Sequence, residues 1–432
     1  MERDLGRGKM KNIKQIIILS FCVITSMAYA QEEKVLTFGE YLNNVKNSNI
    51  EYLVEKYNVE IAEANIKAAK VFPDPELSLS YTNNQNWNLK MGYGFDAELS
   101  YDFELGGKRK ARIELARSEK ELTSVLLEDY FRNLQADATI AYLTAIKQRD
   151  LYEIQKNSYM QLLNLAKADS LRFQKGMIPE TDARQSKLEA ATMLNEVYAG
   201  EGDLNEVLVE LLIFQGSGNS DLPNTIIGSL NQPKRKIDLS SLIIEAQNSR
   251  ADLQAALKSN EVSQKNLRLA KAERGIDLGI SIGGSYASEV KNIDAPAPEF
   301  KSISAGVTIP LKFSNTNKGT VKAAQLLVEQ SEKQYEAIEL QIANEVMQAY
   351  HKYTITCRQV EQFDTGLLED AETIFQKKIY SYERGETSIL EVINAHQTYN
   401  EVQVGYQETL YECAVALIEL ERACGIWDIE IE

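Results

Sequence analysis

Four segments of the chain alternate apolar and polar residues at every second position, which predicts β-strands with two different faces. These strands are expected at about 75–83, 94–104, 277–287 and 303–313. Strands of about ten residues with this pattern are typical of transmembrane β-barrels, although half-buried strands of soluble sheets alternate in the same way. Four strands alone would leave two open edges in a bilayer, so a barrel needs several chains. Eight-stranded barrels are filled by side chains, so a conducting duct favours three chains over two.

Long Ala-rich stretches with helical periodicity flank these strands. They predict helices over 38–71, 107–174, 180–215, 239–273, 317–383 and 387–424. Apolar positions such as Phe131, Leu134 and Ala138 recur three or four residues apart, as in a coiled-coil seam. A helix over 107–174 would be about 100 Å long, as would 38–71 and 180–215 stacked end to end. These matched lengths predict a tall wall of antiparallel helices, which other subunits must complete to enclose a lumen.

The two halves of the chain are similar in sequence, which indicates an internal duplication. Residues 36–81 align without a gap on 237–282, and the glycines Gly176 and Gly216 match Gly385 and Gly425 further along. A polar stretch rich in Gly, Ser and Pro separates the halves and reads as a linker. The predicted organisation is a first repeat over 31–216, a linker over 217–236 and a second repeat over 237–432.

The first thirty residues have the pattern of a secretory signal peptide. Basic residues precede an apolar stretch over 13–30 that ends in Ala28-Tyr29-Ala30, a small-residue cleavage site. Cys22 lies in a loose match to a lipidation site, but Phe21 occupies a position that requires a small residue. We therefore expect residues 1–30 to be cleaved and the rest of the chain to be exported.

Charge and reactive residues exclude several functions. The formal net charge is −16, whereas phosphate binding depends on concentrated positive charge, so nucleic acid is not an expected partner. Beyond the signal peptide lie three cysteines without a CxxC spacing, Cys357, Cys413 and Cys424. The two histidines, His351 and His396, lack the spacing of helical metal ligands. We found no nucleotide-binding loop and no nucleophile with a base, so we expect neither an enzyme nor a bound cofactor.

Four motifs resemble those of the TolC family of outer-membrane efflux proteins. They are FPDPELS at 72–78, FELGGKRKAR at 103–112, RFQKG at 172–176 and YERG at 382–385. The resemblance covers nearly the whole exported chain in both repeats. Its first two motifs are most similar to the heavy-metal branch, the CzcC- and CusC-like partners of resistance-nodulation-division pumps.

The resemblance implies an α+β membrane protein. It implies a homotrimer with a 12-stranded transmembrane β-barrel in outer-membrane lipid, four strands per chain, continued by a long periplasmic α-helical barrel. The expected function is the passive exit channel of a tripartite efflux pump for heavy metals or drugs. The expected partners are a periplasmic adaptor, or membrane fusion, protein and an inner-membrane pump. The alternative is a non-transporting periplasmic coiled-coil structural protein with a small soluble sheet.

Two sets of residues are candidate sites. Acids on the polar face of the second strand would line the lumen, and they are Asp96, Glu98, Asp102 and Glu104. Two helix breaks would form the periplasmic tip, which the resemblance makes the gate and the adaptor docking surface. The tip residues are Gly176 and Gly385 at the turns, Asp182 and Glu391 just after them, and Arg184 and Arg384 as candidate partners of these acids. We expect the two arginines to link neighbouring helices, although first-turn acids also occur simply because the helix dipole favours them.

Overall fold

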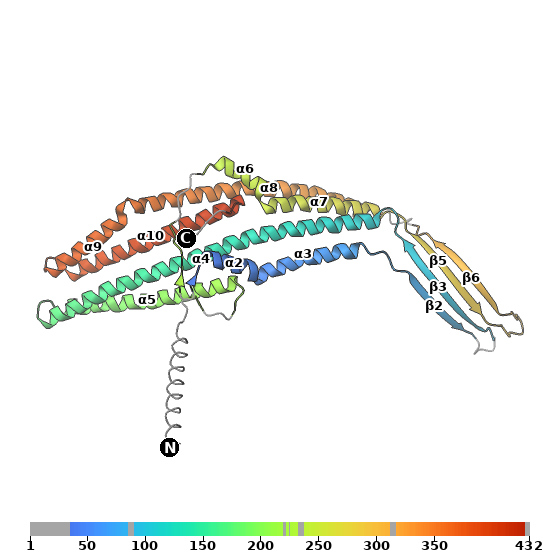
Figure 1. Ribbon diagram of the computed structural model, residues 1–432, viewed down its shortest axis with the longest axis horizontal. Coiled ribbons are helices and arrows are strands. Elements are labelled where there is room, and N and C mark those ends of the chain that lie inside the picture. The colour runs from blue at the N-terminus through green and yellow to red at the C-terminus, as the bar shows by residue number, and fades with distance from the viewer. Residues whose placement is uncertain are drawn as a thin grey trace, which may run out of the picture.

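The computed structural model describes residues 35–84, 90–218, 222–223, 225–231, 237–311 and 317–427. The predicted signal peptide, part of the predicted linker and the end of the fourth predicted strand therefore lie outside the described residues. The chain is elongated and bowed, with helices along most of its length and a β-sheet extending from one end (Figure 1). It is mostly helical with one main sheet, which confirms the α+β class.

The same order of elements occurs in each half. The first half contains α2 (Phe38–Ser48), α3 (Ile50–Ala69), β2 (Glu76–Asn83), β3 (Tyr93–Phe103), α4 (Lys108–Gln174) and α5 (Glu180–Phe214). The second half contains α6 (Leu239–Ser249), α7 (Ala251–Ala272), β5 (Leu278–Ala287), β6 (Phe300–Thr308), α8 (Lys318–Gln362), η1 (Phe363–Leu367), α9 (Leu368–Glu383) and α10 (Ile389–Cys424). Two short strands pair in parallel: β1 (Val35–Leu36), which precedes α2, and β4 (Thr225–Ile226), which lies between α5 and α6 along the chain.

Three of the predicted helices are interrupted. The helix expected over 38–71 breaks at Asn49, and the helix expected over 239–273 breaks at Arg250. The helix expected over 317–383 contains the π-helical turn η1, where Gly366 has a φ of 111°. The two-residue strands β1 and β4 were not predicted, because so short a segment cannot show alternation.

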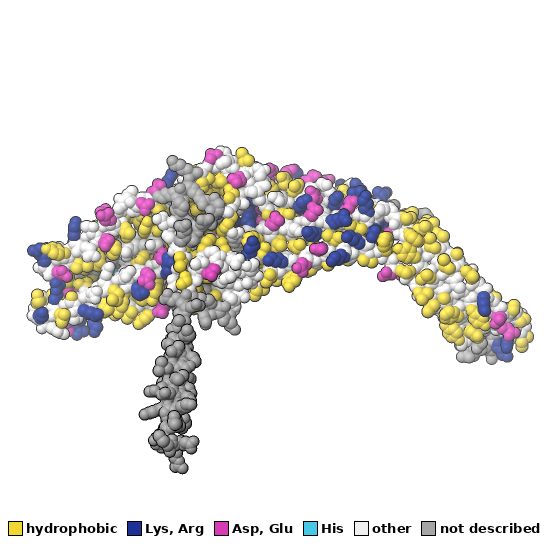
Figure 2. All heavy atoms as spheres, in the orientation of Figure 1, with side chains coloured by type: hydrophobic (Ala, Val, Ile, Leu, Met, Phe, Trp, Pro, Cys, Tyr) yellow, Lys and Arg dark blue, Asp and Glu magenta, His cyan; other side chains and the backbone are white. Residues whose placement is uncertain are grey.

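The main sheet is antiparallel with the order β2-β3-β5-β6. Its register places Leu77 opposite Leu99 and Leu99 opposite Ile282, so apolar side chains share one face. That face is open to solvent in a single protomer: Leu77 is 65% exposed, Ile282 62% and Ile303 89%. Figure 2 shows hydrophobic side chains gathered over this sheet. Within the described residues, β2 and β6 each lack a partner on their outer edge.

The helices pack around a core near the middle of the long axis. Tyr41 and Tyr142 are fully buried there, with their ring centres 5.3 Å apart. The Tyr142 hydroxyl lies 2.9 Å from the carbonyl oxygen of Leu36 and 2.6 Å from that of Ile227, so it ties both short strands to α4. None of the helices in the described ranges is long and apolar enough to cross a membrane.

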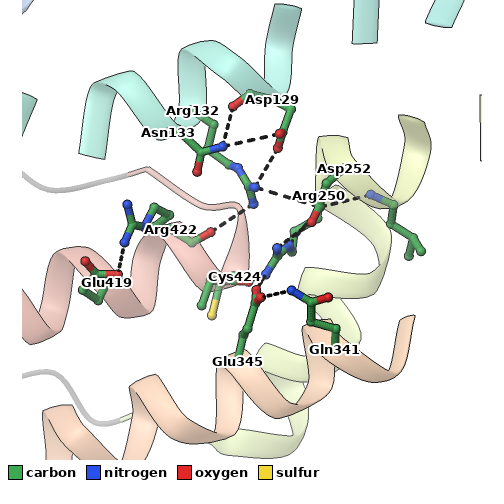
Figure 3. Close-up of polar contacts among 12 residues, drawn as sticks. Asp129, Arg132, Asn133, Arg250, Asp252, Gln341, Glu345, Glu419, Arg422 and Cys424 are labelled. Carbon is green, nitrogen blue, oxygen red and sulfur yellow. Dashed lines mark hydrogen bonds and ion pairs between the residues drawn. The ribbon is translucent and has the colours of Figure 1, made fainter. Parts of the chain in front are cut away.

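A polar joint connects the break between α6 and α7 to the end of α10 (Figure 3). The last three carbonyl groups of α10 each accept a hydrogen bond from a side chain, and the donors are Arg132, Arg250 and Ser249. Arg250 is only 5% exposed, and its guanidinium pairs with Asp252 and Glu345, each at 2.6 Å. In the first half, Asn49 donates a hydrogen bond to the Phe214 carbonyl at 3.0 Å. Each helix break thus caps the C-terminus of the last helix in its own half.

Candidate functional site

The first candidate site is the polar face of the sheet. Asp96, Glu98 and Asp102 alternate along β3 and share this face, as predicted from the alternation. Their cross-strand neighbours are small: Ser80 donates a hydrogen bond to Asp96 at 3.0 Å, and Glu98 lies opposite Gly283. A Cβ atom at Gly283 would lie 2.8 Å from Ser304 Oγ, so the face has little room for larger residues beside the acids.

The register adds one acid to this face, and Glu104 lies just past the end of the ladder. Glu76 lies opposite Ser100, on the same face as Asp96, and the sequence analysis did not single it out because it begins its strand. Glu104 lies beyond the end of β3, and its carboxylate forms two hydrogen bonds with Arg112, at 2.8 and 3.1 Å. Glu104 therefore has a cationic partner at the junction of sheet and helix, and its assignment as a lumen acid stays a prediction.

The second candidate site is the end of the molecule opposite the sheet, where two helical hairpins turn (Figure 1). Gly176 and Gly385 have φ angles of 73° and 77°, in the left-handed region that glycine adopts without strain. At the first turn, the Met177 amide donates to the Arg172 carbonyl at 2.9 Å, which closes a Schellman-type cap. The bond from Glu386 to Ser381, also 2.9 Å, closes the second turn in the same way.

Both acids after the turns lie in the first turn of a helix. Asp182 is in α5 and Glu391 is in α10. The Lys378 ammonium lies 2.5 Å from the Glu391 carboxylate, and this hydrogen bond holds the pKa of Glu391 below its usual value. The two acids are therefore not equivalent, since Glu391 already has a cationic partner in its own hairpin.

Within one chain, the two arginines at the tip pair with residues of their own hairpins, and their links to neighbouring helices stay a prediction. Arg184 pairs with Glu180, one turn away on its own helix. Arg384, the C-cap residue of α9, donates a hydrogen bond to the Tyr380 hydroxyl at 2.7 Å and lies 3.4 Å from the Glu386 carboxylate. Each arginine forms a local hydrogen bond, because side chains four residues apart on a helix are neighbours on its surface.

A different set of residues connects the two hairpins. The Tyr382 hydroxyl donates a hydrogen bond to the fully buried Asp169 carboxylate at 3.1 Å. Arg172 lies 3.7 Å from the same carboxylate, and it also donates a hydrogen bond to the Glu383 carbonyl at 3.0 Å. The Arg172 guanidinium lies 5.3 Å from the centre of the Tyr382 ring. We call Asp169, Arg172 and Tyr382 the tip link.

Burial sets the electrostatics of the tip link. It raises the pKa of Asp169, and hydrogen bonds from Ser186 and Tyr382 together with the charge of Arg172 oppose that rise. The role of Asp169 could not be predicted from the sequence, because 213 residues separate it from Tyr382. Arg172 and Tyr382 are the first residues of the two motifs at the helix breaks. The motifs therefore located the region of the tip link, but they did not indicate which residues pair there.

Long helical hairpins at one end and a sheet with an exposed apolar face at the other are features that the chain shares with the outer membrane efflux proteins. It belongs to the outer membrane efflux protein family, whose model matches residues 42–212 and 242–426. The cobalt-zinc-cadmium resistance protein CzcC of Cupriavidus metallidurans is 22% identical over 400 residues, which cover 90% of each chain.

Solved structures share the fold. A crystal structure of CusC superposes with a TM-score of 0.73 at 18% identity, over 90% of this chain and 91% of that one. The CmeC outer membrane channel of Campylobacter jejuni gives a TM-score of 0.71 at 16% identity, over 90% of this chain and 85% of that one. The family match and the shared fold confirm the resemblance to the TolC family.

Proposed function

We propose that the chain forms a homotrimeric channel in the outer membrane, the exit duct of a tripartite efflux pump. The observation that carries this proposal is the sheet, with its solvent-exposed apolar face and its two outer edges without partners. In a bilayer, lipid would cover the apolar face, and strands from neighbouring protomers would satisfy the edges. Three protomers would supply twelve strands, enough for a barrel with an open lumen.

The helices would then form the periplasmic part of the duct. The helix α4 has 67 residues, which corresponds to about 100 Å. The duct would conduct passively. An inner-membrane pump, joined to it through a periplasmic adaptor, would supply both the energy and the transported substrate. We place the adaptor docking surface at the hairpin turns, around Gly176 and Gly385, because these are the parts of the chain farthest from the sheet (Figure 1).

Native mass spectrometry after extraction of the outer-membrane fraction with a mild detergent tests this assembly. We expect a trimer that requires detergent and contains a chain cleaved after residue 30. A monomer that stays soluble without detergent would instead favour the periplasmic coiled-coil structural protein. The detergent-dependent trimer and the soluble monomer are easy to distinguish, because a sheet outside the membrane would have to cover its apolar face with other parts of the same chain.

The negative charge of the proposed lumen indicates which class of substrate the channel would carry. We define the lumen acids as Glu76, Asp96, Glu98 and Asp102. Three copies of this set would place twelve carboxylates along a water-filled barrel, and rings of acids favour cations. CzcC is by its name a cobalt-zinc-cadmium resistance protein, and divalent metal cations suit such a lumen. Divalent metal ions are therefore the proposed substrate.

The acids near the two hairpin turns would form the gate of the channel. Threefold assembly would bring copies of Asp182 and Glu391 toward one narrowing, where like charges repel unless cations compensate them. We expect the isolated channel to conduct poorly and divalent cations on the periplasmic side to block it further. Asp182 should contribute more than Glu391 to this block, because Lys378 already neutralises Glu391.

Recordings in planar bilayers test the gate. Asp182→Asn with Glu391→Gln should remove most of the cation block, and Asp182→Asn alone should remove more of it than Glu391→Gln alone. The matched control is Asp203→Asn, an exposed acid on the same helix as Asp182. It lies about 30 Å from Asp182 along the helix axis and should leave the block unchanged. Equal block in all variants would show that the tip acids serve only to start their helices.

A further inference from the structure

Two cysteines on different helices lie face to face. Cys357 in α8 and Cys413 in α10 are 56 residues apart, and their Sγ atoms are separated by 3.1 Å. A disulfide bond is about 2.04 Å long, so the sulfur atoms need to approach by only about 1 Å. The spacing of the cysteines along the chain did not indicate this pair, because its two members lie on different helices.

The surroundings suit a covalent link better than a bound ligand. A cavity of about 10 Å³ adjoins the pair, with Tyr353, Val360 and Leu410 in its wall. That volume is at the lower limit for a single water molecule. Among the described residues, no group of three or more His, Cys, Asp or Glu side chains could hold a metal ion. A zinc site would need further ligands around the two sulfurs.

The third cysteine is set apart from this pair. Cys424 is 1% exposed, whereas Cys357 and Cys413 are half-buried. Burial raises the pKa of the Cys424 thiol to about 12, and thiols react as thiolates. Cys424 therefore offers an internal control that should remain a thiol.

We propose that Cys357 and Cys413 form a disulfide bond in the exported protein, an inference that rests on the periplasmic location in the proposed function. The oxidant would be a thiol–disulfide oxidoreductase that carries its own disulfide. One thiolate of the pair attacks that disulfide to give a mixed disulfide, and the second thiolate then displaces the donor. The two hydrogens and two electrons of the thiols leave with the donor as a dithiol, while one S–S bond breaks and one forms.

The position of the link gives it a role in the channel. Cys357 lies six residues before η1, the π-helical turn at which α8 passes into α9. The loop closed by the bond contains α9, the turn at Gly385 and most of α10. The bond would therefore join α8 to α10 on the sheet side of η1, while the part of the hairpin between η1 and the turn at Gly385 stays able to move. When the tip opens, these two helices could then not separate from each other beyond the disulfide, toward the sheet.

The test is mass spectrometry of the full chain taken from the outer-membrane fraction. Cells are quenched with acid and N-ethylmaleimide, and the protein is digested without reduction. We expect a linked pair of peptides carrying Cys357 and Cys413, about 2 Da lighter than the two thiol peptides together, which separates on reduction. Cys424→Ser should leave the linked pair intact, and Cys413→Ser should abolish it. Alkylation of both Cys357 and Cys413 in membrane-inserted protein would overturn the proposal.

A second measurement separates the geometry from the location. The purified trimer is reduced, returned to oxidised glutathione and digested in the same way. We expect the Cys357–Cys413 link to re-form without links to Cys424, and failure to form would overturn the geometric basis. Link formation in vitro with thiols in cells would also overturn the proposal. Fractionation would then decide the cause, because protein outside the outer-membrane fraction points to a wrong location rather than a wrong geometry.

Discussion

The tip link offers the sharpest test of how the channel closes, through the substitution Tyr382→Phe. The change removes one hydroxyl and keeps the ring that packs beside Arg172. The lost hydrogen bond goes to a carboxylate that is fully buried, so water cannot readily replace it. Such a bond to an ionised group contributes about 2 kcal/mol. If the bond is made only in the closed state, its loss shifts the closed-to-open ratio of each protomer by about 30-fold.

Single-channel recordings of purified trimers measure this shift directly. Tyr382→Phe should raise the open probability by more than an order of magnitude relative to the original protein. The matched control is Tyr380→Phe, two residues earlier on α9, where the hydroxyl group serves only its own helix and the side chain is 59% exposed. The reasoning is refuted if both substitutions leave the open probability unchanged, or if the control raises it as much as Tyr382→Phe does.

Three further predictions concern selectivity, acid sensitivity and the polar joint. Replacing the lumen acids by Asn and Gln should abolish a cation preference seen in reversal potentials, and about 1 M salt should weaken that preference in the original protein. Burial lowers the pKa of His396 to about 4 from the usual value of 6.5, so the free energy of unfolding should fall by up to about 3 kcal/mol as the pH drops between these values. Thermal unfolding from pH 7 to 4.5 should depend less on pH in His396→Gln than in the exposed control His351→Gln. Arg250→Met should destabilise the fold by about 3 kcal/mol in chemical denaturation, because it leaves Asp252 and Glu345 without their buried partner; an unchanged midpoint would contradict it.

The regular elements of the fold could be predicted from the sequence because their patterns are local. Alternation locates the strands, and helical periodicity with matched lengths indicates the long antiparallel hairpins. The breaks at Asn49 and Arg250 were not predicted, since the apolar periodicity continues across them. Their cause is tertiary, because each side chain caps the end of a helix more than 160 residues further along the chain.

The same distinction separates the site residues that were found from those that were missed. Alternation is local, so Asp96, Glu98 and Asp102 could be assigned to one face from the sequence. Glu104 continues the alternation but lies past the last ladder pair, and its hydrogen bonds with Arg112 could not be read from the alternation. The tip link joins residues from opposite halves of the chain, so only a three-dimensional structure could reveal it.

The open edges of the sheet also bear on how such a protein is made. In the proposed assembly, a newly exported protomer carries an apolar surface and two rows of unpaired backbone groups. Exposed strand edges of this kind are templates for aggregation, so a lone protomer requires a holdase chaperone until it meets its partners. No protomer can enter the membrane first and wait, because its edges would remain unsatisfied in lipid. Insertion into the membrane and formation of the trimer would therefore occur in a single step.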